Sequence, residues 1–377
     1  MKKIAKNKKT IFKKTISWLH LWPGIISAII LFFVCITGTV VVISDEVIDF
    51  NARHYLYVKN LKEKKIPIEK LLQKAQIEFP DYKLSYFITY RDKKRSVKVL
   101  LFNPKEGLIN VFMDPYTGKV IGKDNTIMFF FVTAHLHASL LLGKTGEWIV
   151  DIASIIFLLE LITGLILWWP KKWTKANCDK NFKIKWKAKW RRLNLDLHNV
   201  LGFYTIIFSI ILVITGLIIA FKPLSNVTVK LFGGDPTNEW MTTLPKSDFT
   251  KKFIGFNKII DKIFISDPTI EAIQGQVYNF DSIGYFMLTS AKNIYLKTTS
   301  NSKTRIYNKY TDKEILIPKP IQKQIQVENL NMMLHMGTWM GKIGKILTFI
   351  VGIIGSSLPL TGFLIWYGKK FKKRKFK

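Results

Sequence analysis

The chain has 377 residues, of which 48% are hydrophobic and 14% aromatic, and its formal net charge is +32. Its apolar residues gather in long runs, which is not the pattern of one ordinary soluble core. So basic a chain could bind nucleic acid, but its lysines and arginines form three clusters beside apolar runs, as topology signals near anionic lipid do. The sequence therefore excludes nucleic acid as the preferred partner and favours a membrane.

Four apolar runs are each long enough to cross a bilayer, which takes about 20 helical residues. They cover residues 21–43, 148–169, 200–221 and 346–367. The first run follows a basic head and could be a cleavable signal peptide, but it is too long and lacks a small-x-small cleavage site. We therefore expect a retained anchor and a multi-pass protein with four spans.

The three basic clusters fall on one side of a chain with four spans, so the positive-inside rule places both termini in the cytoplasm. The two long connections mix acids with bases and are expected outside. In chain order the expected segments are a basic head (1–17), the first span (18–43), outer module 1 (44–127), a histidine segment with the second span (128–170), a basic loop (171–193), the third span (194–221), outer module 2 (222–330), a histidine segment with the fourth span (331–368) and a basic tail (369–377).

The sequence repeats itself. LHLWPG at 19–24 matches LHNVLG at 197–202, and LHASLLLGKTG at 136–146 matches LHMGTWMGKIG at 334–344. The matches continue through Thr-Gly pairs in all four spans, for which helix packing is the expected role. Each half contributes two spans and returns the chain to its starting side, so we expect two parallel repeats related by a pseudo-twofold axis along the membrane normal.

Each long connection is predicted to form a small outer module of a helix and antiparallel strands. In the first module, apolar residues recur at helical spacing before Pro80, and 111–122 reads as a strand, a turn and a second strand. Residues 305–316 are a weaker copy of that hairpin. The expected fold class is therefore membrane α+β. The apolar helix positions are Ile68, Leu71, Leu72 and Ala75.

The repeat also pairs four histidines. His20 and His198 are equivalent and lie at the cytoplasmic starts of two spans, whereas His137 and His335 are equivalent and lie on the outer side. Two facing imidazoles can ligate a haem iron from both sides, and bis-histidine ligation suits electron transfer. We expect two haems, because one alone would not bridge a bilayer about 30 Å deep. The alternative role for each histidine is a hydrogen-bonded anchor at the membrane interface.

Taken together, these motifs resemble the PepSY-associated transmembrane family, bacterial iron-regulated membrane proteins that include periplasmic ferric-siderophore reductases. The resemblance covers nearly the whole chain and rests on LHLWPG, DPYTGKV, LHASLLLG with LITGLILWWP, LHNVLG, and LHMGTWMG with LTGFLIWYG. It implies PepSY-like outer modules, the bacterial cytoplasmic (inner) membrane, and b-type haem as the cofactor. The family's haem-iron ligands fall on His20, His137, His198 and His335.

The function implied by the resemblance is transmembrane electron transfer, in which a separate cytoplasmic donor supplies electrons that reduce an extracytoplasmic ferric complex such as a ferric siderophore. The chain would then be an oxidoreductase. The second outer module departs from the family pattern at Asn308, Lys309 and Asp312, which puts substrate handling there in doubt. The alternative is a membrane-anchored PepSY binding or regulatory protein without redox activity.

Two features stay open at this point. Glu160 is an acid within the second span, where its cost favours a function such as a proton relay or a hydrogen bond, and its repeat counterpart is Leu358. His135 and His137 lie two residues apart and would point about 200° apart on a helix. The repeat favours His137 as the ligand, and His135 is then a neighbour of the haem or substrate, or the ligand itself if the helix is broken there.

Overall fold

The computed structural model describes residues 11–170, 172–248, 250–278 and 281–371. Parts of the predicted basic head, loop and tail, namely 1–10, 171 and 372–377, lie outside the described residues. The chain divides into two compact units. The helical unit contains residues 11–42, 133–222 and 340–371, and the sheet unit contains residues 43–132 and 223–339.

Four stretches of the described chain are long and apolar enough to cross a membrane: Ile11–Val42, Gly143–Trp168, Trp190–Ala220 and Thr338–Phe371. The four predicted spans are therefore confirmed, although the first and third begin earlier than expected, within the predicted head and loop. The elements of the helical unit are α1 (Ile11–Val42), α5 (Gly143–Trp168), α6 (Lys175–Phe182), α7 (Trp190–Asp196), the π-helical turn η1 (Leu197–Leu201), α8 (Gly202–Ala220) and α12 (Gly341–Phe371).

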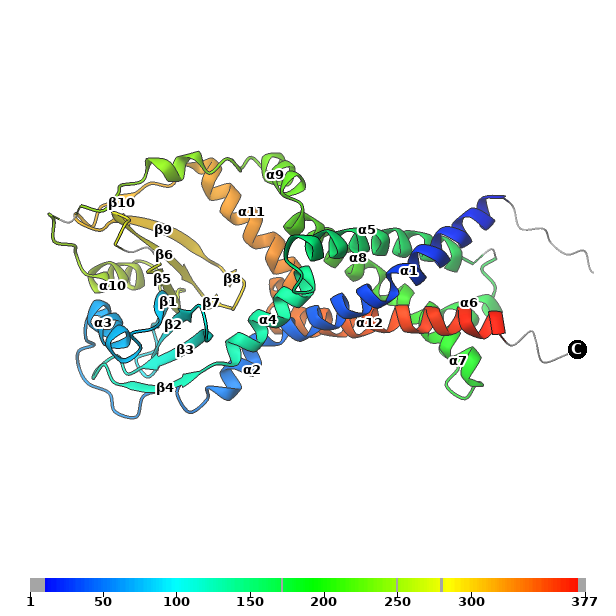
Figure 1. Cartoon of the computed structure of the whole chain (residues 1–377), viewed down its shortest axis with the longest axis horizontal. Coiled ribbons are helices and arrows are strands. Elements are labelled where there is room, and N and C mark those ends of the chain that lie inside the picture. The colour runs from blue at the N-terminus through cyan, green and yellow to red at the C-terminus, as the bar shows by residue number, and fades with distance from the viewer. Residues whose placement is uncertain (1–10, 171, 249, 279–280, 372–377) are drawn as a thin grey trace, which may run out of the picture. The chain divides into compact units, whose positions relative to one another are not determined.

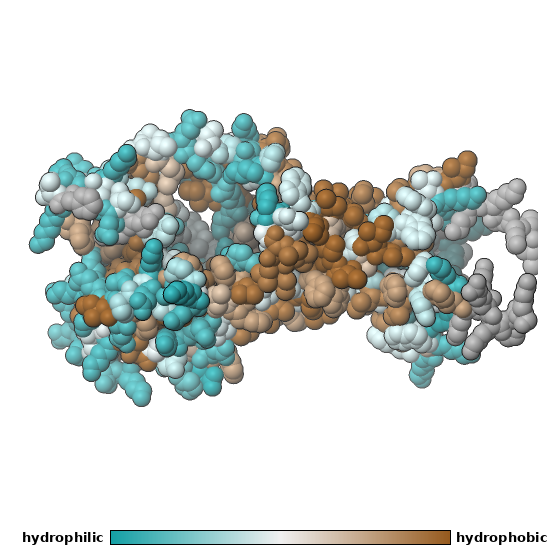
Figure 2. All heavy atoms as spheres, viewed as in Figure 1, coloured by the Kyte–Doolittle hydropathy of each residue, from teal (hydrophilic) through white to brown (hydrophobic). Residues whose placement is uncertain are grey.

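The four long helices pack as a ring in which α1 contacts α5 and α12, and α8 contacts the same two helices (Figure 1). Large apolar side chains cover the outside of this ring. Ile26 is 75% exposed and Ile207 is 68% exposed, and Figure 2 shows hydrophobic residues gathered over these helices. A surface of this kind needs lipid to cover it, which agrees with a multi-pass membrane protein.

The sheet unit contains all ten strands described. Its eight-stranded antiparallel sheet has the order β10-β9-β6-β5-β1-β2-β3-β4, and β7 pairs with β8 separately. The strands are β1 (Lys83–Tyr90), β2 (Val97–Asn103), β3 (Gly107–Met113), β4 (Val120–Asp124), β5 (Ala272–Gln276), β6 (Tyr285–Ala291), β7 (Asn293–Ile294), β8 (Thr299–Ser300), β9 (Lys303–Asn308) and β10 (Glu314–Ile315). The remaining helices are α2 (Ser44–Asn51), α3 (Ile68–Glu78), α4 (Thr126–Ser139), α9 (Lys222–Leu231), η2 (Glu239–Thr243), α10 (Phe256–Ser266), α11 (Lys319–Met336) and η3 (Thr338–Met340). Residues 133–139 of α4, Lys222 of α9 and Met340 of η3 belong to the helical unit.

Both long connections build the same sheet. In each, one helix precedes four antiparallel strands: α3 before β1 to β4, and α10 before β5, β6, β9 and β10. The two sets join where β1 pairs with β5, from Tyr86 opposite Gln276 to Tyr90 opposite Ala272. The membrane α+β class is thus confirmed, and the strands of the two expected modules form one sheet.

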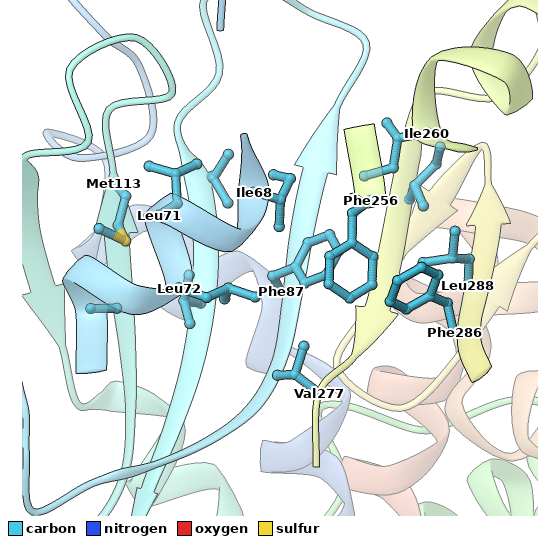
Figure 3. Close-up of a cluster of buried hydrophobic side chains, with 14 of the residues drawn as sticks. Ile68, Leu71, Leu72, Phe87, Met113, Phe256, Ile260, Val277, Phe286 and Leu288 are labelled. Carbon is cyan, nitrogen blue, oxygen red and sulfur yellow. The ribbon is translucent and has the colours of Figure 1, made fainter. Parts of the chain in front are cut away.

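The core of the sheet unit lies between one face of the sheet and the helices α3 and α10 (Figure 3). Ile68, Leu71, Leu72 and Ala75 are all buried in α3, as the helical spacing predicted. Phe256 from α10 contacts Phe87 of β1 and Phe286 of β6, with ring centroids 5.0 Å and 4.2 Å away. The sequence-distant halves therefore share one apolar core.

The two hairpin turns have the same hydrogen bonds despite their different sequences. The Asp114 carboxylate accepts from the backbone N–H groups of Tyr116 and Thr117, at 2.7 and 3.2 Å. The side-chain oxygen of Asn308 accepts from the equivalent residues Tyr310 and Thr311, at 2.9 and 3.2 Å. The departure from the family pattern at Asn308 therefore leaves the turn intact, because the acceptor oxygen is retained.

The fourth residue after each acceptor has left-handed backbone, with φ of 72° at Gly118 and 51° at Asp312. An alanine Cβ at Gly118 would also lie 2.7 Å from Ile66 Cδ1. We expect Gly118→Ala to cost about 1–2 kcal/mol, because a side chain in this conformation is strained. Thermal unfolding of the purified chain measures this, with Asp312→Gly as the control that should not lower the midpoint comparably. An unchanged midpoint in Gly118→Ala would contradict the assigned turn.

Candidate functional site

Two of the predicted ligands meet in the helical unit. His20 lies on α1, and His198 lies in the π-helical turn η1 at the start of the third span. Their ring centroids are 6.3 Å apart, with an angle of 72° between the ring planes. The structure therefore brings together the histidine pair that the repeat had placed at equivalent positions.

A hydrogen bond orients the His20 ring. Its Nδ1 lies 3.0 Å from Thr163 Oγ1 and 2.8 Å from Glu160 Oε2, both on α5. The Thr163 hydroxyl already donates to the Leu159 carbonyl at 2.7 Å, so its oxygen accepts from His20. Nδ1 of His20 therefore carries the proton, and Nε2 carries the lone pair that a metal would bind.

His198 is held in the same way by the other half of the chain. Its Nδ1 lies 2.9 Å from Thr361 Oγ1 on α12, and the Thr361 hydroxyl donates to the Ser357 carbonyl at 2.9 Å. The same reasoning leaves the lone pair of His198 on Nε2. The threonines of these Thr-Gly pairs, for which packing was expected, thus orient the two histidines.

The glycines of the same pairs make room for the imidazole rings. A Cβ at Gly164 would lie 3.1 Å from Cε1 of His20, and one at Gly362 would lie 3.3 Å from Cε1 of His198. These distances are shorter than the contacts of about 3.5–4.0 Å that carbon atoms prefer. Each Thr-Gly pair therefore supplies a hydrogen-bond acceptor and a backbone surface against which a ring can lie.

Polar contacts also fix the segment that carries His198. Asn194 donates from Nδ2 to the Thr361 carbonyl at 3.1 Å, and the buried Asp196 carboxylate pairs with Arg192 at 2.7 Å. The π-helical turn η1 follows directly, and such turns are frequent at functional sites. No pattern in the sequence predicted this turn, because its wider hydrogen-bond spacing has no compositional signature.

His137, one of the two histidines predicted to lie on the outer side, belongs to the helical unit. Its Nδ1 donates to the Val34 carbonyl of α1 at 2.8 Å, since a carbonyl can only accept. Nε2 is then the nitrogen with the lone pair. A Cβ at Gly38 would lie 2.7 Å from Cε1 of this ring, so the Thr-Gly pair of α1 also makes room for a histidine.

The histidine doublet lies on a regular helix. The helix α4 continues to Ser139 and ends only there, followed by positive φ at Leu140, Leu141 and Gly143. The alternative of a helix broken at the doublet is therefore wrong. The His135 side chain is exposed, whereas His137 is half-buried against α1. His137 as the ligand stays a prediction.

His335 belongs to the sheet unit, in the last turn of α11 before Gly337, whose φ is 74°. It lies near the C-terminal end of its helix, as His137 does. The helix that carries it begins at Lys319, within the segment expected to belong to outer module 2. The pairing of His335 with His137 stays a prediction.

The donor set of His20 and His198 suits a haem iron. No group of three or more His, Cys, Asp or Glu side chains able to hold a metal ion occurs among the described residues. A haem brings four nitrogens of its own and needs only two axial ligands from the protein. Metal–imidazole bonds of about 2 Å place the two ligating nitrogens about 4 Å apart. Ring centroids lie behind those nitrogens and so are farther apart, and the centroids of His20 and His198 are 6.3 Å apart.

Comparison with known proteins gives a family match. A family model described as the PepSY-associated TM region matches residues 17–369. This range contains all five predicted site histidines: His20, His135, His137, His198 and His335. No curated protein matches the chain.

Proposed function

The chain belongs to the PepSY-associated transmembrane family, and from that premise we propose that it transfers electrons across the membrane through two b-type haems. The electrons come from a separate cytoplasmic donor and reduce a ferric complex, such as a ferric siderophore, on the outer side. The chain is then an oxidoreductase of the ferric-reductase type.

One observation carries the proposal: His20 and His198, which match in the sequence repeat, have ring centroids 6.3 Å apart and both Nδ1 atoms in hydrogen bonds. A histidine that served only as an anchor at the membrane interface would not need a second histidine beside it. Two imidazoles with fixed tautomers present two Nε2 lone pairs, which is the arrangement that a shared iron requires. Haem supplies a one-electron iron couple when it is bound, and two histidine ligands leave it no open position for oxygen.

The outer haem is assigned to His137 and, from the repeat, to His335. The inner pair includes His20 of α1, and His137 contacts the same helix at Val34. Fourteen residues of helix separate His20 from Val34, which corresponds to about 21 Å along the axis. Sites at these two levels would divide a bilayer core of about 30 Å into steps, which one haem could not do.

The matching order of elements in the two halves supports the proposed parallel repeats. In each half a span is followed by a helix directly before four strands of the eight-stranded sheet, then by a histidine-bearing helix and a second span, and α2, α9, η2, η3 and the β7–β8 pair are additional elements. We infer that the outer modules are PepSY-like and lie outside the cytoplasm, where a ferric complex would dock. The sequence has no G-x-G-x-x-G after a strand, so we assign the cytoplasmic donor to another molecule.

The visible spectrum of the purified full-length chain tests this function. Produced in a haem-replete host, the protein is expected to show sharp reduced b-type bands and two haems per chain by pyridine haemochrome assay. Rapid mixing of the reduced protein with a ferric siderophore should then oxidise those bands. A chain without bound haem would contradict the proposal and leave the anchored binding or regulatory role.

A further inference from the structure

The two inner histidines differ in one contact. Glu160 Oε2 lies 2.8 Å from His20 Nδ1, and the Glu160 side chain is only 12% exposed. Its other oxygen, Oε1, is buried and has no hydrogen-bond partner among the described residues. A carboxylate within a span is costly to keep, and the cost is higher when one oxygen has no hydrogen bond.

The repeat shows that packing does not require this acid. The residue equivalent to Glu160 is Leu358, which faces Gly202 as Glu160 faces Gly24. A Cβ at Gly24 would lie 3.1 Å from the Glu160 carboxylate, whereas one at Gly202 would lie 3.5 Å from Leu358 Cδ2. An apolar side chain therefore fills the same position in the second half.

The acceptors near the three Nδ1 atoms consequently differ in charge. His20 has a carboxylate besides the Thr163 hydroxyl, His198 has a hydroxyl, and His137 has a backbone carbonyl. A hydrogen bond to a charged acceptor is about twice as strong as one between neutral groups. It draws the Nδ1 proton away from the ring and makes Nε2 a more basic ligand.

We propose that Glu160 is a positioning residue that makes the inner haem a stronger reductant than the outer haem. This inference rests on the proposed function. A more basic axial ligand favours ferric over ferrous iron and so lowers the reduction potential of the inner site. With haem bound, the site of His20 and His198 would take one electron from the cytoplasmic donor and give it to the site of His137, from which the ferric complex would take it. Glu160 therefore favours outward electron flow, which the symmetry of the repeat alone would not.

Potentiometric titration of Glu160→Gln in the full-length protein tests this role. Glutamine keeps an acceptor oxygen at nearly the same place and removes the charge. At a fixed poise, the ratio of ferrous to ferric inner haem is expected to rise about tenfold, which is a shift of 59 mV for one electron. The outer haem should titrate as before, and His198→Ala identifies which signal is the inner one.

Asp151→Asn is the matched control, because it removes a carboxylate from the same helix, nine residues before Glu160. It should leave both potentials unchanged. Gly24→Ala is the second variant: its Cβ crowds the Glu160 carboxylate and should raise the inner potential by less than Glu160→Gln does. If Glu160→Gln binds no haem, the Gly24→Ala potential decides.

The possible failures are distinct. Wild-type protein without haem contradicts the proposed function itself. If Glu160→Gln binds two haems and its inner reduction potential is unchanged or lower, the role of Glu160 is wrong. The proposed transmembrane electron transfer is then unaffected. An equal rise in Asp151→Asn also overturns that role, because the effect would then be one of total charge.

Discussion

His198→Ala is expected to lose the inner haem and retain the outer one, so that haem per chain falls from two to one. The reason is that His198 and His20 are the two described side chains assigned to the inner site, where their ring centroids lie 6.3 Å apart. His20 alone would leave the iron with one axial ligand in place of two, which weakens haem binding. Pyridine haemochrome quantification and the low-spin ferric spectrum measure the change.

His54→Ala is the control for this variant, because His54 is exposed in the sheet unit and has no repeat partner. It should keep both haems. His20→Ala should behave as His198→Ala does. Simultaneous loss of both haems in a folded His198→Ala protein, or retention of both, would contradict a separate inner site.

Gly38→Ala should remove the outer haem although it changes no ligand. The new Cβ would lie 2.7 Å from Cε1 of His137, so the ring must leave its hydrogen bond to the Val34 carbonyl. Restoring an ordinary carbon–carbon contact of about 3.5 Å would move the ring by roughly 0.8 Å. Ligand geometry must hold within about 0.5 Å for a functional site, so this shift exceeds the tolerance. Haem content should fall by one while the inner signal is unchanged.

Gly355→Ala provides a matched glycine in α12. Its Cβ would meet Cys35 Sγ at 3.6 Å, an ordinary contact, so both haems should remain. An outer haem that survives Gly38→Ala with unaltered spectrum would rule out His137 as its ligand. The prediction therefore tests the position of a ring and not merely the presence of an imidazole.

Local patterns carried much of the fold. Hydropathy located the four spans, because a bilayer imposes a length on each helix that can be read from the chain. The period of Ile68, Leu71, Leu72 and Ala75 predicted α3, whose buried face is made of those residues. The repeat placed His20 and His198 at equivalent positions, and they meet in the helical unit.

Those local patterns could not predict contacts between segments that are distant in the sequence. Thr163 and Thr361 were visible as repeated Thr-Gly pairs, but only helix packing decides that their hydroxyls meet His20 and His198. The repeat did hold a usable signal, since each Thr-Gly pair recurs at a fixed distance from a Leu-His pair. The pairing of β1 with β5 had no such signal, because strand partners depend on topology and not on local sequence.

That pairing has a consequence for the nascent chain. About 180 residues, including two spans, separate β1 from its partner β5. At a synthesis rate of about 5–20 residues per second, this delay is roughly 10–40 s. During that time one edge of β1 has its backbone groups unpaired and can add a strand from another chain. Biogenesis, more than the finished molecule, is where this sheet is open to aggregation.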